Sequence, residues 1–148
     1  MARATPMKIV IIAEGKLKEP AYRALADDYG ARLLRYCRVE EKEVASREKL
    51  ERAIPESAQI VALEVEGEAL SSSELARKVG TWSAQGKGIL AFVIGGAEGI
   101  PKELSARANY RLSLSKLTLP HRLARIVLLE QLYRAMTILN NEPYAREG

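Results

Sequence analysis

The sequence contains little of the chemistry on which metal sites and disulfide scaffolds depend. It has a single cysteine, Cys37, and a single histidine, His121, among 148 residues. One cysteine excludes an intramolecular disulfide framework and a cysteine-based zinc cage. One histidine and one cysteine are also poor resources for any other transition-metal site, so we expect no metal.

Long apolar runs are absent as well. No run approaches the roughly 20 residues of a membrane helix, and the N-terminus, MARATPMKIV, has neither the apolar region nor the cleavage site of a signal peptide. Hydrophobic residues make up 47% and charged residues 28% of the chain, which favours a globular protein over a disordered one. We therefore expect a cytoplasmic protein without membrane contact, folded as a single domain over residues 1–148.

Basic residues are in modest excess and unevenly distributed. The formal net charge is +4 at pH 7, and residues 109–148 carry six Lys and Arg against three Asp and Glu. The sequence has no basic run of the kind that marks a disordered RNA-binding arm. A basic rim in the C-terminal part suits an anionic partner such as RNA, and ordinary surface charge is the alternative explanation.

Apolar segments and turn residues alternate along the chain. Short apolar runs predict strands at residues 7–13, 37–45, 59–65, 89–94 and 110–114, the second at a sheet edge and the first after a frayed start. Apolar spacing and capping residues predict helices at 20–36, 47–53, 72–85, 101–108 and 121–140. Ser71 and Glu74 form a capping box before the third helix, which Gly86 ends. This order predicts an α/β fold with a mainly parallel sheet flanked by helices.

The last predicted helix is apolar around too much of its circumference for a helix that packs on one side. The apolar residues from Leu123 to Leu139 indicate burial on two sides, and we expect the second side to be another subunit. Past this helix, the tail has nothing apolar left to bury.

Two of the predicted strands end in loops that open into helices. In the first loop, Gly95-Gly96-Ala97-Glu98-Gly99, bare backbone would let a ligand approach the amides, although the spacing matches neither the Rossmann fingerprint nor a P-loop. In the second loop, from Ser115 to Pro120, hydroxyls can bond the backbone of their own turn. Ligands of parallel sheets bind at the carboxyl ends of strands, so we expect a site here. Ordinary turns without a ligand are the alternative.

The same region carries a resemblance to a known family. In chain order, its motifs are Val93-Ile94-Gly95-Gly96-Ala97-Glu98-Gly99, Ser113-Leu114-Ser115, Leu117-Thr118-Leu119-Pro120-His121, Leu132-Tyr133-Arg134-Ala135, and Asn141-Glu142-Pro143-Tyr144 with Arg146. This ordered set resembles the RlmH family, bacterial methyltransferases of the SPOUT superfamily that act on large-subunit ribosomal RNA. The resemblance implies a SPOUT-type fold with a C-terminal trefoil knot, and a homodimer.

The resemblance also implies an activity and its site. The expected enzyme uses S-adenosyl-L-methionine to methylate N3 of a pseudouridine in 23S rRNA within the assembled ribosome. The implied cofactor contacts are Leu63, Gly95, Gly96, Ser115, Lys116, Leu117, Thr118, Leu119 and Pro120. Tyr144 and Arg146 are implied substrate contacts, since a tyrosine ring can stack on a base and an arginine can bind phosphate. The catalytic candidates are His121, Arg134 and Arg146, which can assist loss of the acceptor's N3 proton.

Two other functions stay open from the sequence. A non-catalytic RNA- or ribosome-binding protein could keep the same fold, although the intact glycine and Leu-Thr-Leu-Pro-His segments argue against it. A nucleotide-binding α/β enzyme could use the loop at residues 95–99 for ATP or NAD. Hydrolase chemistry is disfavoured, because the chain has no Gly-x-Ser-x-Gly elbow and its lone histidine has no partner in a recognisable motif.

Overall fold

Strands and helices alternate along the chain, as predicted. The computed structural model describes residues 7–85 and 88–146, so the expected frayed start before Met7 and the expected helix end at Gly86 lie outside the described residues. The elements are β1 (Lys8–Glu14), α1 (Pro20–Leu33), β2 (Arg38–Val44), η1 (Arg47–Lys49), η2 (Glu51–Ala53), β3 (Gln59–Ala69), α2 (Ser72–Gln85), β4 (Ile89–Ile94), α3 (Lys102–Arg107), β5 (Tyr110–Ser113), α4 (His121–Leu139) and η3 (Pro143–Arg146).

The five strands form one sheet in the order β2-β1-β4-β3-β5, and every neighbouring pair is parallel. The predicted α/β class is therefore confirmed, and β2 lies at an edge as its mixed charged and apolar pattern predicted. Because all strands run the same way, their carboxyl ends share one edge of the sheet. The loops after β3, β4 and β5 consequently lie close together at that edge.

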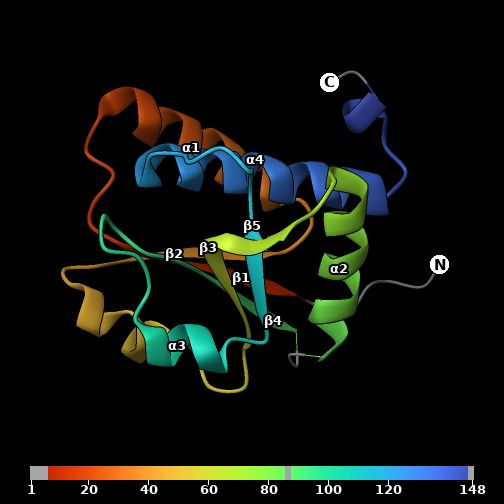
Figure 1. Cartoon of the computed structure of the whole chain (residues 1–148). Helices are drawn as coiled ribbons and strands as arrows, with labels where there is room; N and C mark the ends of the chain where they lie inside the picture. The colour runs from red at the N-terminus through yellow and green to blue at the C-terminus, as the bar shows by residue number, and fades with distance from the viewer. Residues whose placement is uncertain (1–6, 86–87, 147–148) are drawn as a thin grey trace.

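Both faces of the sheet are covered, which explains why β1 and β4 are apolar without alternation. In β1, Ile9 and Ile11 belong to one core cluster, whereas Val10 and Ile12 belong to a second cluster on the opposite face. Helices α1, α2 and α4 cover the first face, and α3 with the short turns η1 and η2 covers the second (Figure 1).

Helix α4 packs against α1, α2 and the sheet (Figure 1). Its residues Leu128, Leu129 and Leu132 are fully buried by these contacts. The apolar coverage of this helix is thus largely satisfied within the chain, and it is no argument for a second subunit. The homodimer stays a prediction. Among the described residues, no helix has the length and apolar character needed to cross a bilayer.

Three elements differ from the predictions in type or by more than one residue. Helix α1 ends at Leu33, and the chain turns through residues 34–37 so that β2 can begin at Arg38. The expected helix at 47–53 is instead two 3-10 turns, which direct Leu50 into the second core cluster. Strand β3 continues four residues beyond Val65 to Ala69, where it pairs with β5 again after a register shift, and Gly67 lets the two backbones approach closely.

The close approach of β3 to β5 at the register shift depends on a bare backbone. The pairing between the two strands is interrupted between Leu63 and Glu68, and a Cβ on Gly67 would lie only 2.6 Å from the Arg111 carbonyl oxygen. No L side chain fits in that space, so Gly67 is required there. The trefoil knot implied by the resemblance stays a prediction.

Candidate active site

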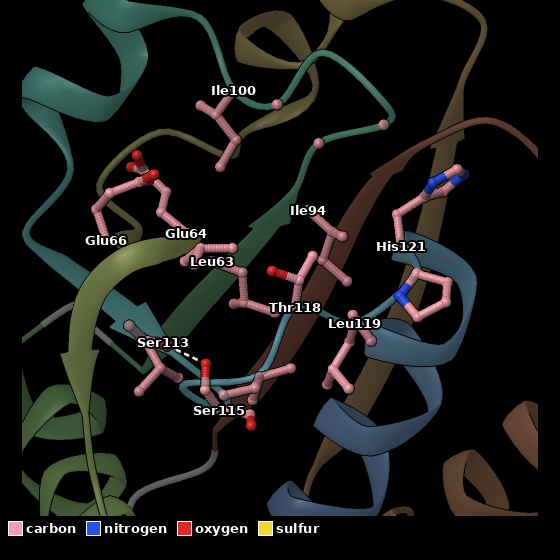
Figure 2. Close-up of a pocket in the computed structure, with 18 of the residues that line it drawn as sticks. Leu63, Glu64, Glu66, Ile94, Ile100, Ser113, Ser115, Thr118, Leu119 and His121 are labelled. Carbon is pink, nitrogen blue, oxygen red and sulfur yellow. Dashed lines mark hydrogen bonds between the residues drawn. The ribbon is translucent and has the colours of Figure 1, made fainter.

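A cavity of about 580 Å³ opens at the carboxyl ends of β3, β4 and β5. Two loops form much of its wall: the glycine loop, residues 95–100, and the Pro120 loop, residues 114–120. Figure 2 shows Leu63, Ile94, Thr118 and Leu119 between Glu64 and Glu66 on one side and His121 on the other. The volume lies in the range of small-molecule sites, so the cavity can enclose a ligand of cofactor size.

Most of the residues predicted to bind a cofactor lie around this single cavity. They are Leu63, Gly95, Gly96, Ser115, Leu117, Thr118, Leu119 and Pro120. Lys116 belongs to the Pro120 loop but does not line the cavity. The two loops expected from the sequence therefore meet at one cavity with Leu63, which the resemblance implied, and the binding role of each residue stays a prediction.

The glycine loop is a tight turn whose two ends touch. The Gly99 N–H donates to the Gly96 carbonyl at 3.0 Å, and a Cβ on Gly95 would lie 2.4 Å from the Gly99 carbonyl carbon. Gly99 has a φ of +76°, which L side chains rarely adopt. At Gly96 the restriction comes from a side chain, since a Cβ there would lie 2.9 Å from the Glu14 carboxylate. The space beside Gly96, which we expected a ligand to fill, is thus partly taken by Glu14.

The Pro120 loop is shaped by its own hydroxyl groups, as predicted. Ser113 Oγ donates to the Ser115 carbonyl at 2.8 Å, and the Leu117 N–H donates to Ser115 Oγ at 2.9 Å. Pro120 is the N-cap of α4, and its carbonyl accepts the Ala124 N–H at 2.8 Å. Leu117 is 75% exposed at the cavity rim. The loop is therefore ordered by short-range bonds that hold its backbone against the cavity.

The cavity is acidic although the protein is basic. Glu64, Glu66 and Glu98 line it, and among the described residues no lysine or arginine does. Burial raises the pKa of Glu64, but hydrogen bonds from Arg111 and Ser105 outweigh burial and hold that pKa below its usual value. Glu64 is therefore ionised at neutral pH. In the described part of the chain, no group of three His, Cys, Asp or Glu side chains could hold a metal ion.

The catalytic candidates His121 and Arg134 do not meet within the chain, and Arg146 does not line the cavity. His121 is the first residue of α4 and lines the cavity, whereas Arg134 lies thirteen residues further along the same helix. At 1.5 Å per residue the two backbones are about 20 Å apart. Arg134 is paired instead with Glu130 at 2.8 Å and lies over the Tyr144 ring, 5.0 Å from its centroid. Arg146 follows in η3, which packs on α4.

The tail is docked on the protein, contrary to the expectation that it has nothing to bury. Tyr144 packs edge-on against Tyr133, with ring centroids 4.7 Å apart, and donates a hydrogen bond to Glu130 at 2.9 Å. Burial, followed by that hydrogen bond, raises the pKa of Tyr144. The Tyr36 hydroxyl donates to Glu142 and holds the start of the tail. The aromatic spacing on α4 and α1 could have signalled this docking surface.

The family comparisons agree with this geometry. The family model described as "Predicted SPOUT methyltransferase" matches residues 7–145. The ribosomal RNA large subunit methyltransferase H of Sorangium cellulosum (strain So ce56) is 47% identical over 144 residues, covering 94% of this chain and 99% of the relative. The relative of the same name from Acetivibrio thermocellus is 42% identical over 159 residues, covering 95% and 100%.

Solved structures share the fold at much lower sequence identity. A probable methylase family protein from Haemophilus influenzae Rd KW20 has a TM-score of 0.55 at 14% identity, covering 93% of this chain and 69% of that one. The SpoU methyltransferase AviRb from Streptomyces viridochromogenes, solved in complex with the cofactor AdoMet, has a TM-score of 0.50 at 11% identity, covering 92% and 60%. These likenesses establish the fold.

Proposed function

Because the chain belongs to the SPOUT methyltransferase family, among the relatives named ribosomal RNA large subunit methyltransferase H, we propose that it is a cytoplasmic ribosomal RNA methyltransferase. The proposed donor is S-adenosylmethionine, the proposed acceptor is N3 of a pseudouridine in 23S rRNA, and the proposed substrate particle is the assembled ribosome. Near-complete coverage of relatives that carry this name supports the proposal.

The acidic cavity is the observation that carries the donor assignment. S-adenosylmethionine is a cation at its sulfonium and ammonium groups, so carboxylates such as Glu66 and Glu98 attract it. ATP and NAD carry several negative charges, and their sites commonly supply lysine or arginine beside a helix N-terminus for the phosphates. The N-terminus of α4 lies at this cavity, but among the described residues no lysine or arginine lines it. The carboxylates of this cavity repel such groups. The nucleotide-binding alternative is therefore disfavoured by charge as well as by motif spacing.

The chain's own residues would bind and orient the reactants. When bound, S-adenosylmethionine supplies a methyl group on a sulfonium that is already activated, so no metal is needed. Leu63 and Leu119 offer apolar walls for an adenine ring, while the glycine loop allows close approach to backbone. Alignment of the two reactants can supply much of the rate enhancement over the uncatalysed reaction. His121 lines the cavity and is our proposed candidate to accept the proton lost by the acceptor.

The separation of His121 from Arg134 leads us to propose a homodimer with a shared site. If Arg134, Tyr144 and Arg146 act in the same reaction as the cavity, a second copy of the chain must bring them to it. A C2 dimer does this twice, because each copy presents the same surfaces to the other. The contacts of the tail fit such a role, since the Arg134 guanidinium lies over the Tyr144 ring and Tyr144 is bonded to Glu130 on α4.

Two measurements test the proposed function. Calorimetry with S-adenosylhomocysteine, ATP and NAD should give binding for the first compound only. Tritium transfer from labelled donor to undermodified ribosomes, followed by mass mapping of the rRNA, should place one methyl group on a pseudouridine, and free 23S rRNA serves as the comparison. A protein that binds ribosomes but not S-adenosylhomocysteine would instead be a non-catalytic RNA-binding protein.

A further inference from the structure

Two charged side chains from distant segments hold the glycine loop at its two ends. At the start of the loop, the Gly96 N–H donates to Glu14 Oε1, at the end of β1, at 3.2 Å. At the end of the loop, Arg47 donates from Nε to the Gly99 carbonyl at 3.1 Å and from Nη2 to the Ile100 carbonyl at 3.2 Å. Arg47 belongs to η1, which follows β2 in the chain, and lies 52 residues before Gly99.

The loop needs such partners because it has few side chains of its own to pack. Glycine loses more conformational freedom on ordering than any other residue, and this segment contains Gly95, Gly96 and Gly99. Hydrogen bonds to charged groups are about twice as strong as neutral ones. The half-buried Arg47 guanidinium is planar and presents two N–H groups to two successive carbonyls, which a lysine ammonium cannot match.

We propose that Glu14 and Arg47 are positioning residues that hold the glycine loop in its donor-binding shape. The consequence for donor binding rests on the proposed function, whereas the effect on the loop does not. The two residues act from opposite ends of the same short turn. Loss of either should loosen the loop without disturbing the core clusters, to which neither side chain belongs.

The first experiment measures backbone amide hydrogen exchange in the free protein, over peptides that span the glycine loop. We expect Arg47→Gln to raise the exchange rate of the Gly99 amide at least about tenfold. Glu14→Ala should do the same for the Gly96 amide. Arg47→Lys should have a smaller effect than Arg47→Gln, and Glu14→Gln, which keeps an acceptor oxygen, a smaller effect than Glu14→Ala. Lys49→Gln, an exposed change in the same 3-10 turn as Arg47, is the matched control and should leave exchange unchanged.

The second experiment titrates the same variants with S-adenosylhomocysteine and S-adenosylmethionine. We expect Arg47→Gln and Glu14→Ala to weaken both by at least about tenfold, or roughly 1.4 kcal/mol. Wild-type exchange rates in the loop of a folded Arg47→Gln variant would overturn the proposal, even if the wild type bound no donor. A Glu14→Gln variant with a normal loop that lost affinity for the sulfonium compound alone would assign Glu14 to the donor's charge and overturn its positioning role.

Discussion

Gly95 and Gly96 are neighbours in the glycine loop, but a side chain at each would meet different atoms. At Gly95 it would meet the Gly99 backbone at 2.4 Å, and at Gly96 the end of the Glu14 side chain at 2.9 Å. A flexible carboxylate can move aside, and a backbone in a tight turn cannot. We predict that Gly95→Ala weakens S-adenosylhomocysteine binding at least about tenfold and that Gly96→Ala has a smaller effect. Calorimetric titration measures both.

Gly30 provides the control for these substitutions. It lies in α1 with nothing within 4 Å of the position of a Cβ. Alanine there should raise the free energy of unfolding by about 0.5–1 kcal/mol through better helix propensity and leave donor affinity unchanged. Equal losses of affinity at Gly95 and Gly96 would contradict the distinction between backbone and side-chain neighbours.

Arg125 illustrates a buried charge that is fully paired. Its side chain is 4% exposed and donates to Glu43 at 2.5 Å, to Glu41 at 3.2 Å and to the Gly15 carbonyl at 3.1 Å. These bonds fix the first turns of α4 to β2 and to the loop after β1. We predict that Arg125→Met lowers the free energy of unfolding by about 1–3 kcal/mol at pH 7, because Glu41 and Glu43 then keep only Arg23 as a cationic partner. Urea unfolding measures the loss.

The pH dependence of this loss tests its cause. Burial raises the pKa of Glu43, but hydrogen bonds from Arg125 and from the Leu17 N–H outweigh burial, so the pKa lies below its ordinary value of 4.5. A carboxyl with a depressed pKa in the folded state adds stability above its unfolded pKa, and that stability is lost as the pH falls through the folded pKa. The difference in the free energy of unfolding between the wild type and Arg125→Met should therefore become smaller below about pH 4.5. A difference of constant size would exclude the ion pairs as its source.

At the scale of elements, the tail with η3 is held by contacts with α4 and Tyr36. A chain ending at Asn141 loses the Tyr144 ring contact and the bonds to Glu130 and Glu142. We predict a loss of about 1–3 kcal/mol in the free energy of unfolding. Donor affinity should stay near wild type, because the tail does not line the cavity, and methyl transfer to ribosomes should fall at least about tenfold.

Calorimetry and tritium transfer on the truncated chain separate these outcomes. A control chain ending at Arg146 keeps η3 and should transfer methyl groups like the wild type. Full transfer by the chain that ends at Asn141 would remove the tail from substrate recognition, and loss of donor binding would place the tail at the cofactor instead.

Elements with a local signal were predictable, and contacts between distant segments were not. The capping box of α2 is confirmed, with the Ser71 N–H donating to Glu74 at 2.8 Å and the Glu74 N–H donating to Ser71 Oγ at 3.1 Å. The alternation of strands and helices along the chain and the two loops at the cavity follow from similar local patterns, whereas the order of the strands within the sheet was not predicted. By contrast, the bond from the Gly96 N–H to Glu14 and the bond from Arg47 to the Gly99 carbonyl join residues 82 and 52 positions apart. The periodicity of the sequence carries no signal for such contacts.

At the scale of the whole molecule, charge is divided between two regions. The cavity carries carboxylates, whereas Arg134 and Arg146 lie on the far part of α4 and in the tail. A cationic donor and a polyanionic RNA need opposite fields, and one acidic pocket cannot attract both. Delivery of the tail by a second copy would place arginines at the rim of the acidic cavity without lining its interior with positive charge.

A complementation experiment decides whether the site is shared between subunits. One variant, Gly95→Val, damages the cavity, and the other, Arg146→Ala, damages the tail. If each active site combines the cavity of one copy with the tail of the other, a mixed dimer has one complete site and should show about half of wild-type transfer. Co-expression with two affinity tags allows the mixed dimer to be isolated, and each variant alone should be nearly inactive.

The control pair is Arg134→Ala with Arg146→Ala. Both substitutions damage the part of the proposed site that the tail and the end of α4 contribute, and both leave the cavity intact. Every site of that mixed dimer contains a damaged half, so no activity should return. Transfer by the first pair and not by the second is expected only when cavity and tail come from different copies. If cavity and tail worked within one protomer, the Gly95→Val and Arg146→Ala pair would have one damaged component in each site and stay inactive. A wild-type protein that sediments as a stable monomer at micromolar concentration and still transfers methyl groups would contradict the shared site directly.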